Sequence, residues 1–269
     1  MSGSELRLVL IGWGAIATRV ADLLAERAAP VDLIAVAVRD GTTRPEDLPA
    51  GTRLIDDPGA LADLAFDLAV EAAGRESVGP WGRAVLARGA DFAPASTSAF
   101  VDEGLLDDLT ALARSSGAQL VIPPGALGGI DALAAAARLP LAGVRHEIVK
   151  PPQAWTGTPA EALCDLAGLN APATFFEGSA REAARAFPQN ANVAVITALA
   201  GLGLDRTTVA LVADPGARRN SHRIRAEGDF GTMEIALENR PLASNPKSSE
   251  MTALSLVRLI ENRAGARVV

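Results

Sequence analysis

A chain of 269 residues, 49 % of them hydrophobic, can form one large domain or two modest ones around a sizeable core. Its formal net charge of −7 argues against nucleic acid as a partner, since binding to a phosphate backbone relies on a basic surface. No apolar run reaches the roughly 18–20 residues of a membrane span, and the N-terminus lacks the segments of a signal peptide, so we expect no membrane contact.

The first predicted element is an apolar strand over residues 6–11, which runs directly into a Gly-x-Gly-x-x-Ala pattern that begins at Gly12. A strand, a glycine-rich turn and a helix in this order form the dinucleotide-binding fingerprint. Gly12 permits the tight turn, and Gly14 lets a pyrophosphate approach the backbone. We expect the N–H groups at the start of the helix, at Ala15 and Ile16, to bind the phosphates. The alternative is a tight turn that binds no nucleotide.

The second predicted strand, over residues 31–38, is followed by Arg39 and Asp40, just over 20 residues beyond the fingerprint. An acidic residue at this point binds the ribose hydroxyls of NAD, whereas an arginine there favours the 2′-phosphate of NADP. Adjacent residues on a strand point to opposite faces, so we expect only one of the two to face the ribose. The cofactor is therefore NAD or NADP, and the use of both is a hypothesis.

Strands and helices continue to alternate through the first half of the chain. The expected strands cover residues 67–73, 91–96 and 119–122, and the expected helices cover residues 81–88 and 105–114. Apolar strands that alternate with helices indicate a parallel sheet covered on both faces. The prediction is an α/β chain whose residues 1–125 form an N-terminal Rossmann-type, dinucleotide-binding domain.

The pattern changes in the second half to consecutive strands, which indicate a smaller α+β domain over residues 126–248. The expected helices cover residues 130–139, 182–187 and 193–202, and the expected strands cover 143–149, 207–212, 222–227 and 232–238. Gly228–Gly231 is a hairpin signal between the last two strands. A final helix within residues 249–269 carries one apolar face, and we expect it to pack back on the first domain.

Three residue types restrict the chemistry. The absence of tyrosine excludes a tyrosine acid, and two histidines, His146 and His222, argue against a metal site built from several histidines. The single cysteine, Cys164, excludes an internal disulfide and fits a cytoplasmic protein. We interpret Cys164 as a small apolar helix residue, because nothing beside it would lower the pKa of its thiol.

Several short segments of the second half carry a specific pattern. They are Pro123–Leu133, Lys150-Pro151-Pro152, Phe175–Ala180, Phe187–Val193, Asn220-Ser221-His222, Gly228–Gly231, Asn239-Arg240-Pro241 and Asn245–Ser249. Together with the fingerprint, these segments resemble the L-aspartate dehydrogenase family over the whole chain. Two departures are Ser96–Ala99, where the family pattern has a Ser-x-Gly-Ala turn, and the bulky Trp13 between the two glycines.

The resemblance implies an NAD(P)-linked oxidation of L-aspartate to iminoaspartate, which can hydrolyse to oxaloacetate and ammonia or feed NAD biosynthesis. It also implies that His222 is the catalytic residue. By the same resemblance, Ala126 and Asn192 contact the nicotinamide end of the cofactor.

The residues themselves offer few groups for the proton transfer at nitrogen that this reaction needs. Histidine suits this role because its pKa lies near neutrality. His222 is expected near a strand end. His146 is expected in mid-strand, and we interpret His146 as a structural or solvent-facing residue. Asp131 and Glu227 are alternative bases, although each is more simply a polar surface residue.

The two substrate carboxylates require cations. Lys247 is the preferred candidate, because it precedes the last helix, where Ser248 and Ser249 can cap and N–H groups can bind an anion. Lys150 is a second candidate. Arg223 and Arg225 alternate with His222 along one strand, so we expect them to point away from it.

Two other functions compete with this interpretation. One is a different two-domain dehydrogenase, similar to homoserine dehydrogenase or dihydrodipicolinate reductase. The other is a sensor that binds NADH without turnover and needs neither His222 nor a carboxylate site. We expect a small-molecule substrate and a homodimer, because symmetric dimers are the most common oligomers.

Overall fold

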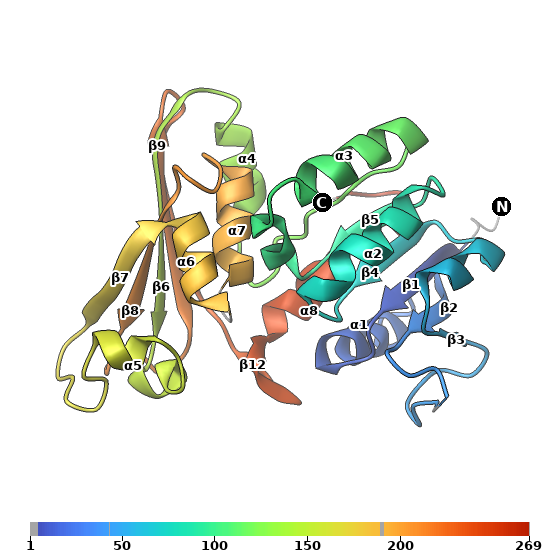
Figure 1. Cartoon of the computed structure of the whole chain (residues 1–269), viewed down its shortest axis with the longest axis horizontal. Coiled ribbons are helices and arrows are strands. Elements are labelled where there is room, and N and C mark those ends of the chain that lie inside the picture. Colours follow the sequence, from blue (N-terminus) through green and yellow to red (C-terminus); the bar gives the residue numbers. More distant parts are fainter. Residues whose placement is uncertain (1–4, 43, 189–190, 269) are drawn as a thin grey trace. The chain divides into compact units, whose positions relative to one another are not determined.

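The computed structural model describes residues 5–42, 44–188 and 191–268, and the chain divides into two compact units (Figure 1). The first unit comprises Met1–Pro123 and Thr252–Val269, and the second comprises Pro124–Met251. Each unit has its own five-stranded sheet. The mixed α/β class predicted from the sequence is confirmed.

The sheet of the first unit is parallel, with the strand order β3-β2-β1-β4-β5. Its strands are β1 (Leu6–Ile11), β2 (Val31–Ala37), β3 (Arg53–Ile55), β4 (Leu68–Glu71) and β5 (Asp91–Pro94). The strand order reverses between β1 and β4, and ligands of such sheets bind outside the carboxyl ends of the strands at this reversal. The Gly-x-Gly turn directly follows β1, so the fold places it at this point.

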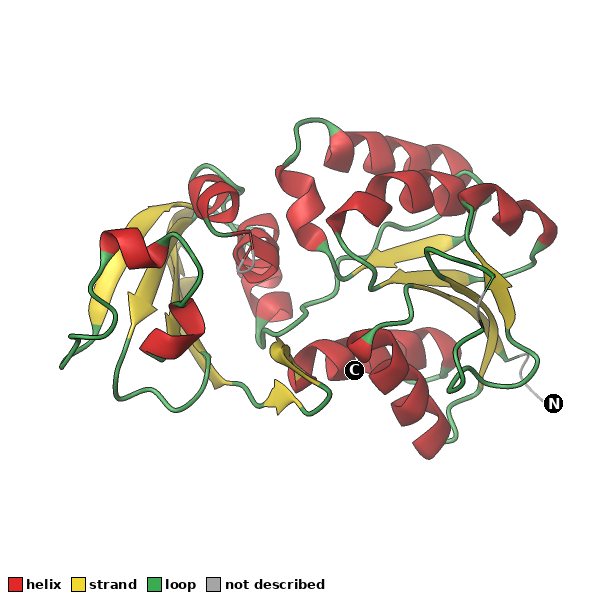
Figure 2. Cartoon of the chain, turned by 60° about the horizontal axis from the view of Figure 1, so that its bottom comes forward, coloured by secondary structure: helices red, strands yellow, loops and turns green. Residues whose placement is uncertain are grey.

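Helices cover both faces of this sheet (Figure 2). They are α1 (Ala15–Glu26), α2 (Arg75–Leu86), α3 (Leu105–Ser116) and α8 (Glu250–Ala264), with 3-10 turns η1 (Pro58–Asp63) and η2 (Thr97–Val101). The apolar face of α8 joins the core of this unit, where Leu256 and Ile260 pack with Val20 of α1 and Leu10 of β1.

Two predicted boundaries in the first unit are wrong. We expected a helix to begin near Trp81, just after Pro80, but α2 begins at Arg75 and contains Pro80 in its second turn. The predicted strand over residues 119–122 is reduced to one isolated bridge between Leu120 and Phe92. The Asp91 carboxylate accepts the N–H of Gln119, and Pro123 has no N–H, so a longer ladder cannot form.

The sheet of the second unit is mixed, with the order β10-β9-β6-β8-β7. Its strands are β6 (Leu141–Lys150), β7 (Ala173–Ser179), β8 (Thr208–Ala213), β9 (Ser221–Gly228) and β10 (Gly231–Glu238). Only the pair β6–β8 is parallel among the described pairings. The predicted hairpin is confirmed, because Gly228 and Gly231 close the β9–β10 turn.

One face of this sheet packs against helices. The second unit contains η3 (Pro152–Trp155), α4 (Ile130–Ala136), α5 (Ala160–Leu163), α6 (Ala180–Ala186) and α7 (Ala191–Ala200), with a small hairpin of β11 (Pro241–Leu242) and β12 (Asn245–Ser249). Alanines of α6 and α7 pack on Ile148 and Leu211, around the buried ring of Trp155. On the opposite face, Arg145 forms ion pairs with Glu147 and Glu177.

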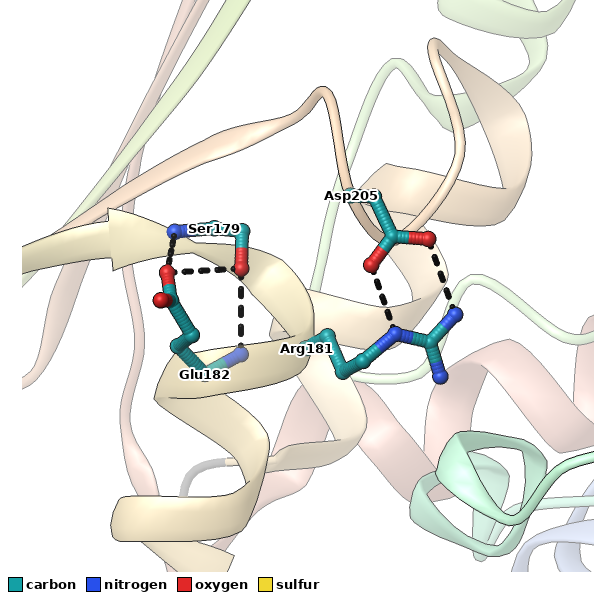
Figure 3. A network of polar contacts seen from close by, with 4 residues as sticks. All are labelled: Ser179, Arg181, Glu182 and Asp205. Atoms are coloured by element: carbon teal, nitrogen blue, oxygen red, sulfur yellow. Dashed lines mark hydrogen bonds and ion pairs between the residues drawn. The ribbon is translucent and has the colours of Figure 1, made fainter.

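The start of α6 is fixed by polar contacts (Figure 3). Ser179 and Glu182 form a reciprocal capping box, in which the Ser179 hydroxyl accepts from the Glu182 N–H and the Glu182 carboxylate accepts from the Ser179 N–H. Arg181 binds both oxygens of Asp205, at 2.6 and 3.0 Å, and so ties α6 to the turn before β8.

The second unit differs from expectation at four points. β7 was not predicted as a strand, and the helix from Ile130 ends at Ala136 rather than at residue 139. Cys164 is not a helix residue, because α5 ends at Leu163 and Cys164 has extended backbone with a half-buried side chain. Residues 245–249, expected as a capping turn, form β12, although the Ser249 hydroxyl does accept from the N–H of Met251.

Candidate active site

The glycine-rich turn of the first unit has the geometry that a dinucleotide requires. Gly12 has a φ of +97°, and a Cβ there would lie 2.8 Å from Cα of Ala73 in the turn after β4. Only glycine fits this position, since both the dihedral and the approach of the second backbone exclude a side chain. Gly14 precedes Ala15, the first residue of α1, with no side-chain cap. The N–H groups of Ala15 and Ile16 are thus at an uncapped helix N-terminus, which suits a phosphate.

A cleft of about 500 Å³ lies at this turn, within the first unit. It is lined by Ile11, Gly12, Trp13, Gly14, Ala37, Val38, Arg39, Asp56, Ala72, Ala73, Ser77 and Trp81. The Trp13 indole N–H donates a hydrogen bond to the Asp47 carboxylate at 2.8 Å. Residues from the ends of β1, β2 and β4 contribute to this lining, so a dinucleotide fits the cleft by its position in the fold.

Arg39 and Asp40 have different surroundings in the structure. Arg39 lines the cleft, whereas Asp40 is not among the lining residues. The Asp40 carboxylate instead accepts from the Thr42 hydroxyl at 2.6 Å and from the Thr42 N–H at 2.9 Å, which lowers the pKa of Asp40. Asp56, which follows β3, also lines the cleft, and it could not be predicted because it lies in no recognised motif.

Glu71, the last residue of β4, is a fully buried carboxylate beside this cleft. It accepts four hydrogen bonds from two loops: from the N–H groups of Ala73 and Gly74 after β4, and from the N–H and hydroxyl of Ser96 after β5. Buried charge is costly unless it is hydrogen-bonded in this way. Glu71 therefore fixes the two loops to each other, and no motif in the sequence indicates this role.

In the second unit, the two histidines of the chain form one buried pair. His222 lies on β9 opposite Ile148 of β6, and His146 lies one pleat along β6, opposite Ile224. His146 Nε2 is 3.1 Å from His222 Nδ1, and the side chains are 0 % and 6 % exposed. On its other side, His146 Nδ1 is 2.9 Å from the Thr197 hydroxyl of α7. His146 is thus buried and not solvent-facing, and it contacts His222, the candidate catalytic residue.

Burial and a nearby cation keep His222 neutral. Desolvation, together with the positive charge of Lys150, lowers the pKa of His222 to about 4. Burial also lowers the pKa of Lys150, to about 8. The Lys150 ammonium lies 5.0 Å from the centre of the Trp155 ring, a cation–π contact. Between these two pKa values, a neutral histidine and a charged lysine coexist.

The loop that carries Ala126 is anchored by Asn239, which follows β10. The Asn239 amide donates to the carbonyl oxygen of Ala126 at 2.8 Å, and the Asn239 N–H donates to the carbonyl of Asn220 at 2.9 Å. Asn239 is buried, so the contact links the end of β10 to both the Ala126 loop and the segment before β9. Asn192 lies in the first turn of α7; the preceding Gln189 and Asn190 of its motif lie outside the described residues.

The remaining candidates are exposed. Lys247 lies on β12, where its N–H bonds the Asn245 side chain and its own side chain is exposed. Arg223 and Arg225 are exposed and alternate with the buried His222 and Ile224, as predicted. The alternative bases, Asp131 and Glu227, are also on the surface.

Each unit, taken by itself, has one of the two groups of features that a dehydrogenase needs: a cofactor site or candidate catalytic residues. The first has a glycine turn and cleft for a dinucleotide, and the second has a buried histidine beside a buried lysine. Among the described residues, no cluster of three or more metal-ligating acidic, cysteine or histidine side chains occurs, and no helix is long and apolar enough to cross a membrane. The fold and site thus define an NAD(P)-dependent dehydrogenase.

Comparison with known proteins gives the family. Residues 131–263 match the C-terminal domain model of aspartate dehydrogenase, and residues 12–123 match the NAD-binding domain model of homoserine dehydrogenase. The chain is 61 % identical, over the full length of both chains, to an L-aspartate dehydrogenase of Brucella anthropi. It is 43 % identical to that of Pseudomonas aeruginosa, over 97 % of this chain and 98 % of the relative. The chain belongs to the L-aspartate dehydrogenase family.

The fold agrees with this assignment. The crystal structure of aspartate dehydrogenase from Thermotoga maritima superposes with a TM-score of 0.79 at 26 % identity, covering 98 % of this chain and 99 % of that one. The match to an NAD-binding domain gives the cofactor class as NAD or NADP. The chain is therefore an oxidoreductase of the amino-acid dehydrogenase class.

Proposed function

We propose that this chain oxidises L-aspartate to iminoaspartate, with NAD or NADP as the hydride acceptor. The observation that carries this proposal is the buried His222, kept neutral beside the cationic Lys150. A neutral imidazole can accept a proton from the substrate nitrogen, and an ammonium close enough to interact with it electrostatically can bind a carboxylate. The product can hydrolyse to oxaloacetate and ammonia.

Different residues of the second unit transfer the substrate proton, bind the substrate carboxylates and contact the nicotinamide. His222 takes the proton from the amine as the bond between Cα and hydrogen breaks. Lys150 binds one carboxylate, and Lys247 on β12 is proposed for the other. Ala126, held by Asn239, and Asn192 are proposed to contact the nicotinamide end of the cofactor.

The residues of the first unit hold the dinucleotide. Gly12 and Gly14 give the pyrophosphate access to the backbone, and the N–H groups of Ala15 and Ile16 bind it. Arg39 lines the cleft and is proposed to contact the adenosine ribose or its 2′-phosphate, with Asp40 beside it. The domains are accordingly residues 1–125 for the cofactor, together with the helix within 249–269, and residues 126–248 for the substrate.

The proposed cellular context has three separate grounds: the single cysteine for the compartment, the commonness of symmetric dimers for the oligomer, and the family resemblance for the pathway. We place the enzyme in the cytoplasm, as a homodimer that supplies iminoaspartate to NAD biosynthesis. Sedimentation of the purified protein tests the dimer, since a mass near that of one 27.6 kDa chain would contradict it.

The decisive experiment is the reduction of NAD⁺ and, separately, NADP⁺ with L-aspartate, followed by the absorbance of the reduced nicotinamide. We expect turnover with aspartate and none with glutamate, alanine or homoserine. Turnover with homoserine instead would assign the chain to another dehydrogenase. Tight NADH binding without turnover on any of these substrates would indicate a sensor.

A further inference from the structure

The chain contains a row of four polar groups that ends at His222. The Thr197 hydroxyl is 3.1 Å from the carbonyl oxygen of Val193, one turn earlier in α7, and 2.9 Å from His146 Nδ1. His146 Nε2 is in turn 3.1 Å from His222 Nδ1. The two rings are tilted by 54° with centroids 5.3 Å apart, so they meet edge to edge through these nitrogens and do not stack.

Only one placement of the protons turns every contact in this row into a hydrogen bond. A carbonyl oxygen carries no proton, so the contact with Val193 is favourable only if the Thr197 hydroxyl donates to it. A hydroxyl has a single proton, and Thr197 must therefore accept from His146 Nδ1–H. A neutral imidazole carries one N–H, so His146 Nε2 is an acceptor and His222 Nδ1 is the donor to it.

The opposite placement leaves one contact unsatisfied. If Thr197 donated to His146 Nδ1, two oxygen atoms would face each other across the Val193 contact with no proton between them. That placement therefore makes one hydrogen bond fewer in the row, and a buried hydrogen bond contributes to stability. The burial of His146 and Thr197, both 0 % exposed, removes water as a substitute partner.

We propose that His146 and Thr197 are positioning residues, which hold neutral His222 as the tautomer protonated at Nδ1 and leave Nε2 free to accept the substrate proton. This inference rests on the proposed function only for the identity of the proton donor. When the amine proton bonds to Nε2, His222 becomes an imidazolium whose Nδ1–H still donates to His146 Nε2. The proton goes no further, and the positive charge is stabilised by a hydrogen bond.

The test reads the tautomer directly and needs no activity. Nitrogen-15 spectra of the full-length protein near neutral pH contain only two imidazoles, and a His222 variant assigns them. The nitrogen-15 chemical shift of a ring nitrogen that lacks a proton differs strongly from that of a ring nitrogen that carries one. We expect His222 to be protonated at Nδ1 alone. Protonation of His222 at Nε2 would overturn the proposal.

Matched threonine variants separate positioning from packing. Thr197→Val keeps the shape but removes the hydroxyl, whereas Thr197→Ser keeps the hydroxyl. We expect Thr197→Val to disturb the His222 tautomer and to lower kcat for aspartate about 10- to 100-fold, as for outer-shell partners of metal-bound histidines, with the Kd for NADH unchanged. Thr197→Ser should restore both the spectrum and the rate.

The control is Thr207→Val, because Thr207 is equally buried in the same unit and its hydroxyl has no hydrogen-bond partner among the described residues. It should leave the histidine spectrum unchanged. His146→Leu and His146→Gln form a second pair, since the glutamine oxygen can still accept from His222 Nδ1. Equal spectra of His222 in wild type, Thr197→Val and His146→Leu would also overturn the proposal. The expected tautomer in a protein without aspartate turnover would instead contradict the proposed function alone.

Discussion

His222 lies where β9 begins, paired with β6, and the residue is only 6 % exposed to water. A general acid or base of this kind contributes about 10²–10⁴-fold to turnover. We therefore expect His222→Ala to lower kcat for aspartate by this factor, with the Kd for NADH little changed, since the cofactor cleft belongs to the first unit. Steady-state rates and NADH fluorescence titration measure the two quantities. An unimpaired variant would remove His222 from the mechanism.

The lowered pKa of Lys150 predicts that the binding of a dicarboxylate depends on pH. Burial lowers its pKa to about 8, so its positive charge is present below this pH and is lost as the pH rises through it. Succinate carries two carboxylates but no amine, so its binding is free of the amine titration of aspartate. We expect the inhibition constant of succinate to rise about tenfold per pH unit above pH 8.

Lys150→Arg is the matched variant for this prediction, because an arginine stays charged over the whole range. The rise of the inhibition constant should disappear in Lys150→Arg. A wild-type constant that stays flat from pH 7 to 10 would mean that Lys150 does not bind the carboxylate.

Arg39 offers a prediction on cofactor choice. It lines the cleft, whereas the Asp40 carboxylate is already bound to Thr42. Arginine at this point binds the 2′-phosphate that only NADP has. We expect Arg39→Gln to raise the KM for NADP⁺ about tenfold or more, the loss of one charge-assisted contact, and to change that for NAD⁺ little. Asp40→Asn is the control, and an equal effect of Arg39→Gln on both cofactors would contradict this role.

At the scale of elements, Glu71 joins the loops that follow β4 and β5. Its four hydrogen bonds hold the turn that approaches Gly12 and the Ser96 turn in one arrangement. An amide keeps only one of the two acceptor oxygens and places N–H groups against donors. We therefore expect Glu71→Gln to lower the free energy of unfolding by about 1–3 kcal/mol.

Glu76→Gln is the matched control for the Glu71 prediction, because Glu76 lies in the first turn of α2 and its side chain is 96 % exposed. Urea denaturation compares the two variants. Equal stability of both would show that the buried carboxylate does not hold the loops.

At the scale of the whole molecule, the first unit is built from both ends of the chain. Helix α8 returns from the second unit and supplies Ala253, Leu256, Val257 and Ile260 to the core around β1 and α1. An ion pair between Arg27 of α1 and Glu261 of α8 adds a polar contact. The first unit is therefore incomplete without the last 18 residues, Thr252–Val269.

This arrangement predicts a large effect of a substitution near the C-terminus. Ile260 is fully buried, and truncation of a buried isoleucine to alanine typically costs about 2–5 kcal/mol. We expect Ile260→Ala to lower the free energy of unfolding by this amount. The control is Leu254→Ala on the same helix, where the leucine is 41 % exposed and the loss should be below 1 kcal/mol. Similar losses in urea denaturation would contradict the packing of α8.

Much of the fold could be predicted because its signals are local. The Gly12 turn, the apolar strand before it and the Gly228–Gly231 hairpin each depend on residues within a few positions of one another. Boundaries failed where a distant group competes for the backbone, as at Gln119, whose N–H goes to Asp91. β7 lacked a clear alternation in sequence, and its pairing with β8 decides its conformation.

By itself, the sequence determined the nucleotide turn, the alternation of strands and helices, the family and His222 as the candidate base, because motifs and periodicity are written in neighbouring residues. Only the tertiary structure decided what surrounds these groups. His146 and His222 are 76 residues apart, Thr197 and His146 are 51 apart, and Glu71 reaches Ser96 across 25. Desolvation and hydrogen bonding depend on such contacts, so the neutral state of His222, the lowered pKa of Lys150 and the role of Glu71 became visible only in the folded chain.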